Sequence, residues 1–141
     1  MPSRELVHEW ANFLNRWEWQ GFWTLTFKHD YTVWAARRAL LRWALRWTLP
    51  APDGPSFIFF LEWQQFGRVH FHGLTRNEIG PRIEMWSDWK ERHGLARSES
   101  YNPSLGANYY CAKYLTKADG ETILDERRIN QWPARMSIGN L

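Results

Sequence analysis

The stretch 56–74, SFIFFLEWQQFGRVHFHGL, decides the fold of this protein. Its two halves are rich in aromatic and β-branched residues, which favour β-strands. A short connection ending in glycine, Gln65-Phe66-Gly67, separates the halves. A three-residue loop with glycine in the left-handed conformation is a common way of joining two antiparallel strands. The sequence therefore predicts a β-hairpin at the centre of the chain.

The register of this hairpin brings three possible metal ligands together. It places Glu62 opposite His70 and Gln64 opposite Arg68, and opposed side chains have Cβ atoms about 5 Å apart. His70 and His72 point to the same face, because side chains alternate along a strand. One carboxylate and two imidazoles on one face suit Mg²⁺ or Mn²⁺, with Zn²⁺ as an alternative. The competing interpretation is that both histidines are ordinary half-buried strand residues.

The amino-acid composition limits the classes of protein to which this chain can belong. A chain of 141 residues is expected to form one domain, 1–141, and its 44% hydrophobic content favours a folded core. The net charge of +3 is compatible with a phosphate-rich partner. The single cysteine, Cys111, excludes an intramolecular disulfide and fits a reducing cytoplasm. The sequence contains no signal peptide and no apolar run of membrane-spanning length, so we expect a cytoplasmic protein without a membrane partner.

Hydrophobic periodicity predicts an alternation of helices and strands around the hairpin. The other predicted strands are 22–27 and 95–101, and the predicted helices are 4–18, 33–48, 81–93 and 107–117. The order β-α-β-β-α-β predicts an α+β fold with an antiparallel sheet of about five strands, as in ferredoxin-like and RNA-recognition domains. We expect the helices to pack on one face and the active site to lie on the other. The tail from Glu121 has too little periodicity for an assignment.

Two of these helices have distinct apolar and charged sides. Thr32 is the expected N-cap of helix 33–48, and Gly94 is the expected C-cap of helix 81–93. The residues expected to face the core are Trp34, Leu41 and Leu45 in the first helix and Ile83, Trp86 and Trp89 in the second. Arginines at i, i+4 and i+8 favour a solvated stripe on the first helix, made of Arg38, Arg42 and Arg46.

The helix 107–117 carries a second group of reactive side chains. Tyr110, Lys113, Tyr114 and Lys117 share one face of this helix. A phenol titrates near pH 10, and a nearby lysine or metal ion favours the phenolate. In a domain that also holds a metal site, we interpret a tyrosine here as a nucleophile. The alternative is a surface helix whose tyrosines lie half over the core.

These motifs together resemble those of the HUH endonucleases, in particular the rolling-circle replication initiators of phages and plasmids. The first motif corresponds to the strand 22–27, FWTLTF, and the second to His70-Phe71-His72. The third corresponds to the tyrosine helix, and Glu62 matches the acidic ligand upstream of the histidines. The His pair and the double Tyr-Lys motif are specific in combination, whereas the first motif is weak.

The resemblance implies a nickase and strand transferase that acts on single-stranded DNA at a hairpin-associated replication origin. A metal ion held by Glu62, His70 and His72 would polarise the scissile phosphate. A tyrosine would attack it, leaving a 5′-phosphotyrosine and a 3′-OH that a host polymerase extends with the help of a host helicase. The resemblance favours Tyr114 as the first nucleophile and Tyr110 as the second. Residues Lys113 and Lys117 would bind or neutralise phosphate, and we expect a monomer.

Three alternatives share part of this pattern. A transposase or relaxase of the same superfamily would use the same chemistry, although relaxases place their tyrosine before the histidines. A non-catalytic RNA-recognition module would have the same strand order but would need aromatic side chains on the sheet face. A structural protein would use the histidines only for packing. We expect no helicase domain in this chain, because 141 residues leave no room for one.

Overall fold

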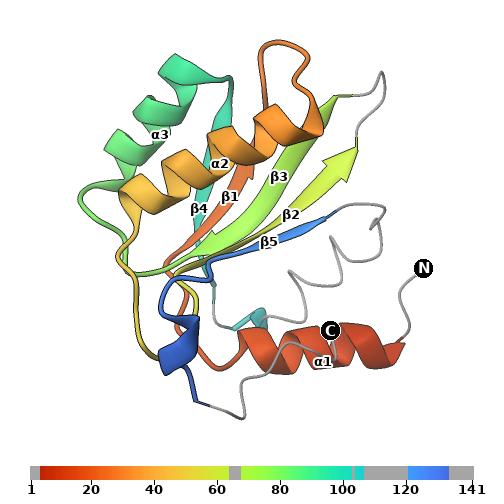
Figure 1. The fold of residues 1–141 in the computed structure, drawn as a ribbon, viewed down its shortest axis with the longest axis vertical. Helices are drawn as coiled ribbons and strands as arrows, with labels where there is room; N and C mark the ends of the chain where they lie inside the picture. Colours follow the sequence, from red (N-terminus) through yellow and green to blue (C-terminus); the bar gives the residue numbers. More distant parts are fainter. Residues whose placement is uncertain (1–3, 64–67, 103, 107–120, 134–141) are drawn as a thin grey trace.

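The structure is a computed structural model that describes residues 4–63, 68–102, 104–106 and 121–133. Helices and strands alternate along most of this part of the chain (Figure 1). In chain order they are α1 (Arg4–Leu14), β1 (Gly21–Leu25), α2 (Val33–Trp47), β2 (Phe57–Trp63), β3 (Val69–Thr75), α3 (Arg82–Arg92), β4 (Ala96–Ser100), β5 (Thr122–Leu124) and the 3₁₀ helix η2 (Ile129–Gln131).

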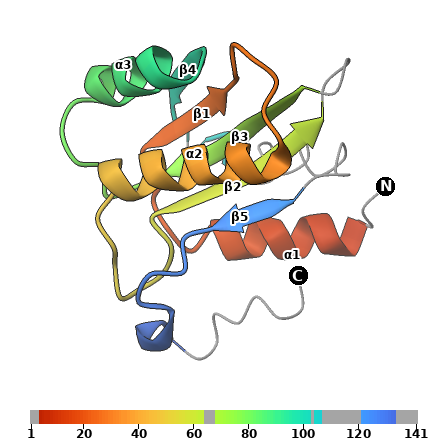
Figure 2. The same cartoon turned by 45° about the horizontal axis from the view of Figure 1, so that its top comes forward.

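The five strands form one antiparallel sheet in the order β4-β1-β3-β2-β5. The segment containing α2 connects β1 to β2, and the segment containing α3 connects β3 to β4 (Figure 2). Each connection passes over a strand that lies between the two strands it joins, which is the split β-α-β arrangement of ferredoxin-like folds. The predicted α+β fold with an antiparallel sheet of about five strands is therefore confirmed.

Helices α2 and α3 cover one face of the sheet and enclose the larger hydrophobic core. Helix α2 begins where predicted, because the Thr32 hydroxyl accepts a hydrogen bond of 3.1 Å from the backbone N–H of Ala35. Fully buried indole rings fill the space between helices and sheet: Trp23 meets Trp43 edge-on with ring centroids 5.0 Å apart, and Trp43 meets Trp89 at 5.8 Å. Aromatic pairs in this geometry add to the stabilisation from burial alone.

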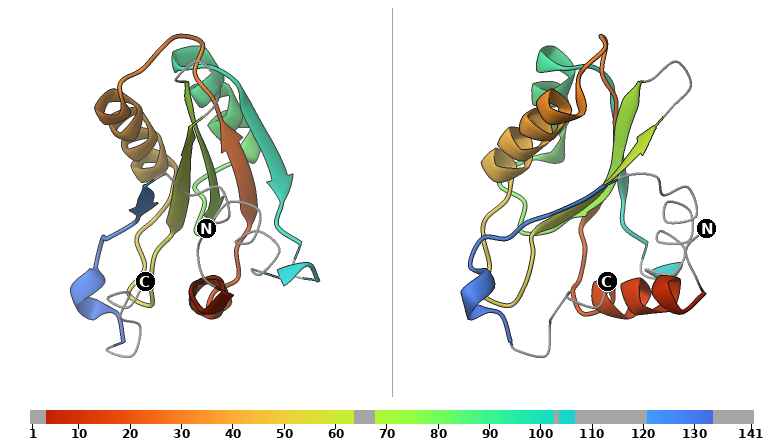
Figure 3. Two further views of the ribbon diagram at one scale, coloured as in Figure 1. Left: turned by 90° about the vertical axis from the view of Figure 1, so that its right-hand side faces the viewer. Right: turned by 45° about the vertical axis from the view of Figure 1, so that its right-hand side comes forward.

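Helix α1 lies on the opposite face of the sheet from α2 and α3 (Figure 3). The strands carry apolar side chains on this face as well, and α1 buries them: Trp10 packs edge-on against Phe60, with ring centroids 5.6 Å apart. The expected arrangement of helices on one face therefore holds for α2 and α3 but not for α1. The physical reason is that Phe22, Ile58 and Leu74 would otherwise be exposed to water on the second face.

Side-chain directions on α2 and α3 differ in part from those predicted. The exposed fraction is 66% for Trp34, 44% for Leu45 and 65% for Ile83, so the prediction that they face the core was wrong. On α2 the residues that do face the sheet are Ala36, Ala39, Leu40, Trp43 and Ala44. The small alanines let the helix backbone approach the sheet closely, which sets the rotation of the helix. The predicted arginine stripe is exposed, and Trp89 is fully buried as expected.

Several chain ends and connections differ from the sequence-based assignment. The C-cap of α3 is His93, one residue before the predicted Gly94. The unassigned tail from Glu121 contributes β5, which pairs with the outer edge of β2, and then η2. The predicted helix 107–117 lies outside the described residues. No described helix has both the length and the apolar character needed to cross a membrane.

Candidate metal centre

The hairpin of β2 and β3 has the register predicted from the sequence. Glu62 pairs with His70, and Phe60 pairs with His72. Paired residues of antiparallel strands share a face of the sheet, and residues two positions apart do so as well. The carboxylate of Glu62 and both imidazoles therefore project from the face that α1 partly covers.

The donor atoms of these three side chains converge on one point. The Nε2 atom of His72 lies 3.0 Å from Oε2 of Glu62, and the Nε2 atom of His70 lies 3.4 Å from Oε1 of Glu62. The two Nε2 atoms are 3.0 Å apart. Donors bound to one ion at about 2.1 Å are separated by about 3.0 Å at right angles and about 3.4 Å at the tetrahedral angle. The three groups thus fit adjacent ligand positions on a single divalent cation.

Burial strengthens the electrostatic case for a cation at this point. His70 and His72 are only 6% and 8% exposed, and the Glu62 side chain is 16% exposed. A carboxylate removed from water is costly unless a positive charge or hydrogen bonds compensate it. Neutral imidazoles supply lone pairs but no charge, and a divalent cation would interact favourably with all three groups at once. Hydrogen bonding within the cluster, with a proton shared between Glu62 and an imidazole, is the competing explanation.

The neighbouring strand β1 adds to the candidate site a residue that was not predicted from the sequence. Thr24 of β1 pairs with His72 of β3, and its Oγ1 atom lies 3.1 Å from Nδ1 of that histidine. On the far side of β1, Thr24 pairs with Arg97 of β4, whose side chain is 82% exposed. Arg97, Thr24 and His72 therefore form a row across the metal-centre face. The order of β4, β1 and β3 in the sheet creates this row, and no local pattern in the sequence reveals it.

The predicted nucleophile helix lies outside the described residues. Its four candidate residues are Tyr110, Lys113, Tyr114 and Lys117. The structure therefore brings together the three predicted metal ligands, and the position of the tyrosines relative to them stays a prediction. The same holds for Gln64, which was expected opposite Arg68.

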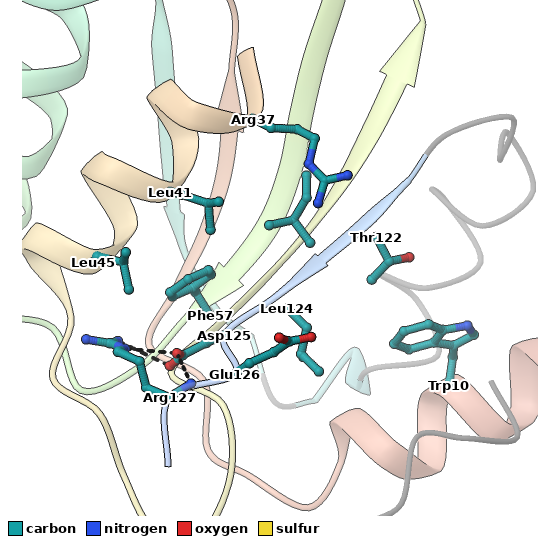
Figure 4. Close-up of a pocket in the computed structure, with 11 residues that line it drawn as sticks. Trp10, Arg37, Leu41, Leu45, Phe57, Thr122, Leu124, Asp125, Glu126 and Arg127 are labelled. Atoms are coloured by element: carbon teal, nitrogen blue, oxygen red, sulfur yellow. Dashed lines mark hydrogen bonds and ion pairs between the residues drawn. The ribbon is translucent and has the colours of Figure 1, made fainter. Parts of the chain in front are cut away.

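A pocket of about 490 Å³ lies along the β5 edge of the sheet (Figure 4). Leu41 and Leu45 of α2 line it from one side and Trp10 of α1 from another. An ion pair closes one end, in which Nε of Arg127 lies 2.9 Å from Oδ1 of Asp125. None of the three candidate ligands lines this pocket. It is consequently a feature separate from the metal centre.

The arrangement of Glu62, His70 and His72 supports a metal centre, with Thr24 beside one ligand and Arg97 on the same face. No protein-family model matches this chain, and comparisons with curated proteins and with solved structures find no significant match either.

Proposed function

We propose that this protein is a metal-dependent endonuclease of the HUH type that nicks single-stranded DNA and transfers the cut strand through a tyrosine. Initiation of rolling-circle replication in the cytoplasm is the biological role that this chemistry would serve. The convergence of Glu62, His70 and His72 is the observation that carries the proposal. These three residues are the His-hydrophobic-His motif and the acid upstream of it, which in the sequence resemble the metal ligands of that family.

The proposed metal centre would hold Mg²⁺ or Mn²⁺ through one carboxylate oxygen and two imidazole nitrogens. A bound divalent ion supplies Lewis acidity that withdraws charge from a scissile phosphate. Glu62, His70 and His72 would supply three ligands, fewer than such an ion usually takes, so phosphate oxygens and water could supply others. Their burial excludes water from the protein side of the site and makes these electrostatic interactions stronger than they would be in bulk solvent.

The transfer step proposed for the tyrosines is an exchange of phosphodiester bonds. The phenolate oxygen of Tyr114 forms a bond to phosphorus while the bond to the 3′ oxygen breaks. That oxygen takes up a proton and leaves as a 3′-OH, and the 5′ end stays attached to the tyrosine. Lys117 would favour the phenolate and neutralise phosphate charge. In the second half of the cycle Tyr110, assisted by Lys113, would attack the next phosphate and free a new 3′-OH. That 3′-OH would then attack the phosphotyrosine at Tyr114, which joins it to the first 5′ end and releases the Tyr114 phenol.

The non-catalytic RNA-recognition alternative is weakened by the second face of the sheet. Such modules stack bases on aromatic side chains exposed on the sheet surface. Here the aromatic residues on that face, Phe22 and Phe60, are 6% and 8% exposed and pack within the cluster beneath α1. The side chains next to them on this face are two buried histidines and a largely buried glutamate instead.

A cleavage assay tests the proposal. The full chain would be incubated with Mn²⁺ and a labelled pool of DNA hairpins carrying random single-stranded flanks, and protein-linked DNA would be detected on a denaturing gel. We expect adduct with the wild type, and none after chelation or in the double variant His70→Ala/His72→Ala. His8→Ala removes an exposed histidine of α1 and is the matched control. A lack of adduct in the wild type across the whole pool would count against a nuclease.

The two tyrosines can be assigned with the same assay. Tyr114→Phe should abolish most of the initial adduct, because it removes the proposed first nucleophile while keeping the aromatic ring. Tyr110→Phe should leave the initial adduct but reduce the strand transfer that closes the cycle. Intact-mass analysis and peptide mapping would locate the DNA linkage. An adduct on Tyr110 alone would reverse the assignment, and an adduct on neither residue would exclude the covalent mechanism.

A further inference from the structure

The imidazole of His72 is held at both of its nitrogen atoms. Its Nε2 atom faces the proposed metal position, 3.0 Å from both Oε2 of Glu62 and Nε2 of His70. Its Nδ1 atom points the other way, to Oγ1 of Thr24 at 3.1 Å. Thr24 and His72 are directly paired in the sheet, so the backbones of β1 and β3 fix the distance between them.

We propose that Thr24 is a positioning residue for metal binding, which holds His72 with Nε2 directed at the ion. This inference rests on the metal site of the proposed function and adds a residue to it. Histidine binds a metal through a ring nitrogen that carries no proton, so the other nitrogen must carry it. With the ion at Nε2, the Nδ1–H group of His72 donates to the hydroxyl oxygen of Thr24.

A hydroxyl group is well suited to this position because it can donate as well as accept. Before the ion binds, Nε2–H of His72 can donate to Nε2 of His70 while the Thr24 hydroxyl donates to Nδ1 of His72. After binding, the proton is on Nδ1 and the hydroxyl accepts from it. The ring keeps the same orientation in both states, so the ion meets a ligand that is already in place.

The strand conformation adds rigidity to this contact. Threonine is branched at Cβ, and its χ1 angle is restricted in a strand. The Thr24 side chain is partly buried between the neighbouring strands, which also limits its movement. By comparison, Thr26 lies two residues further on and its hydroxyl donates to the backbone oxygen of Leu95 at 3.2 Å. Thr26 is therefore a matched control on the same segment, because its hydroxyl bonds to Leu95 and not to a proposed ligand.

Calorimetric titration of the full chain with Mn²⁺ in the absence of DNA tests this role. Thr24→Val keeps the shape of the side chain but removes the hydroxyl, and we expect Mn²⁺ affinity to fall about 10- to 100-fold, as for other partners of metal-binding histidines. Thr24→Ser restores the hydroxyl and should bind close to wild type. Thr26→Val should also bind like the wild type. The urea midpoint of each variant checks that it is folded.

A spectroscopic measurement separates positioning from a general structural effect. In the Mg²⁺-loaded wild type, long-range ¹H–¹⁵N correlation should show the proton of His72 on Nδ1. In Thr24→Val under the same Mg²⁺ concentration, that signature should be reduced, and Thr24→Ser should recover it. Recovery by serine would not be expected if Thr24 only stabilised the fold.

The outcomes distinguish this inference from the proposed function itself. A wild-type protein that binds no Mn²⁺ would overturn the metal site and the proposed function with it. A wild type that binds Mn²⁺, together with Thr24→Val of equal affinity, would overturn only the role of Thr24. Equal losses in Thr24→Val and Thr26→Val would also overturn it, because the effect would then belong to the segment rather than to the contact with His72.

Discussion

At the scale of single residues, Gly73 shows how closely the strands around the proposed metal centre are packed. It follows His72 on β3 and lies between Trp23 of β1 and Phe59 of β2. A Cβ atom here would lie 2.3 Å from Cδ1 of Phe59 and 2.4 Å from the backbone oxygen of Ile58. Real Cβ contacts are not this short. A backbone oxygen in the middle of a sheet cannot move aside without a substantial cost in free energy.

Gly73→Ala should therefore lower the free energy of unfolding by about 1–3 kcal/mol, the usual cost of overpacking a core. Urea denaturation followed by tryptophan fluorescence would measure the loss. Adding Phe59→Leu should recover only part of it, because the Ile58 carbonyl remains in place. An unchanged urea midpoint in Gly73→Ala would show that β3 can shift to admit a side chain.

The surroundings of His93 predict that the stability of the fold depends on pH. Burial lowers the pKa of His93 below its usual value of 6.5, and the adjacent Arg92 lowers it further. The ring packs against Trp89, with centroids 4.7 Å apart, and its Nδ1 lies 3.2 Å from the Tyr31 hydroxyl. Since the unfolded chain takes up a proton at higher pH than the folded one, stability should be lost as pH falls below about 6.5.

A variant isolates this contribution from that of the other histidines. His93→Gln removes the titrating group, so its free energy of unfolding should change less between pH 7.5 and pH 5.5 than that of the wild type. Urea denaturation at several pH values would give both slopes. Because His70 and His72 are present in both proteins, their titration affects the two slopes alike. Equal slopes would mean that His93 is protonated equally in the folded and unfolded chains.

At the scale of elements, the start of α2 depends on one side chain. Thr32 has extended backbone angles, φ −64° and ψ 156°, and its hydroxyl accepts from the N–H of Ala35. Thr32→Ala should cost about 1 kcal/mol of stability, because a backbone N–H in the first turn loses its acceptor. Thr32→Ser retains the acceptor and is the matched control. Thermal unfolding of the three proteins would test this, and equal midpoints for alanine and serine would show that the cap contributes nothing.

At the scale of the whole molecule, the two faces of the sheet have different roles. Helices α2 and α3 occupy one face with the larger core, whereas the other face carries α1 and the proposed metal centre. If single-stranded DNA reaches that centre, phosphate contacts should come from cations on the same face. Arg97 is placed there by its pairing with Thr24, and its 3.9 Å approach to the exposed Glu99 is too weak an ion pair to hold it away from DNA.

Salt dependence can show which face the DNA occupies. Each phosphate contact on a single strand contributes about 0.7 to the slope of log affinity against log salt. Arg97→Ala should therefore reduce the slope by about that amount, whereas Arg42→Ala, on the exposed side of α2, should leave it unchanged. Fluorescence anisotropy with a labelled single strand would measure both. If Arg42→Ala reduced the slope and Arg97→Ala did not, the DNA would lie on the face of the sheet that α2 and α3 cover.

The sequence by itself determined the hairpin and therefore the geometry of the proposed metal ligands. The pairing of Glu62 with His70 follows from alternation along two strands and from the length of the loop between them, which are local properties of the chain. The N-cap of α2 is local in the same sense, since Thr32 bonds to a residue three positions away. Features of this kind can be predicted because the residues that decide them are close together in the sequence.

Only the tertiary structure decided how the distant elements are combined. It placed Thr24 beside His72, 48 positions away in the chain, and it added β5 to the outer edge of β2. It also turned Trp43 of α2 toward the sheet in place of Trp34, and brought α1 over the second face. The physical reason is that pairing and packing between distant segments depend on how the whole chain buries its apolar surface, and no periodicity within a single segment contains that information.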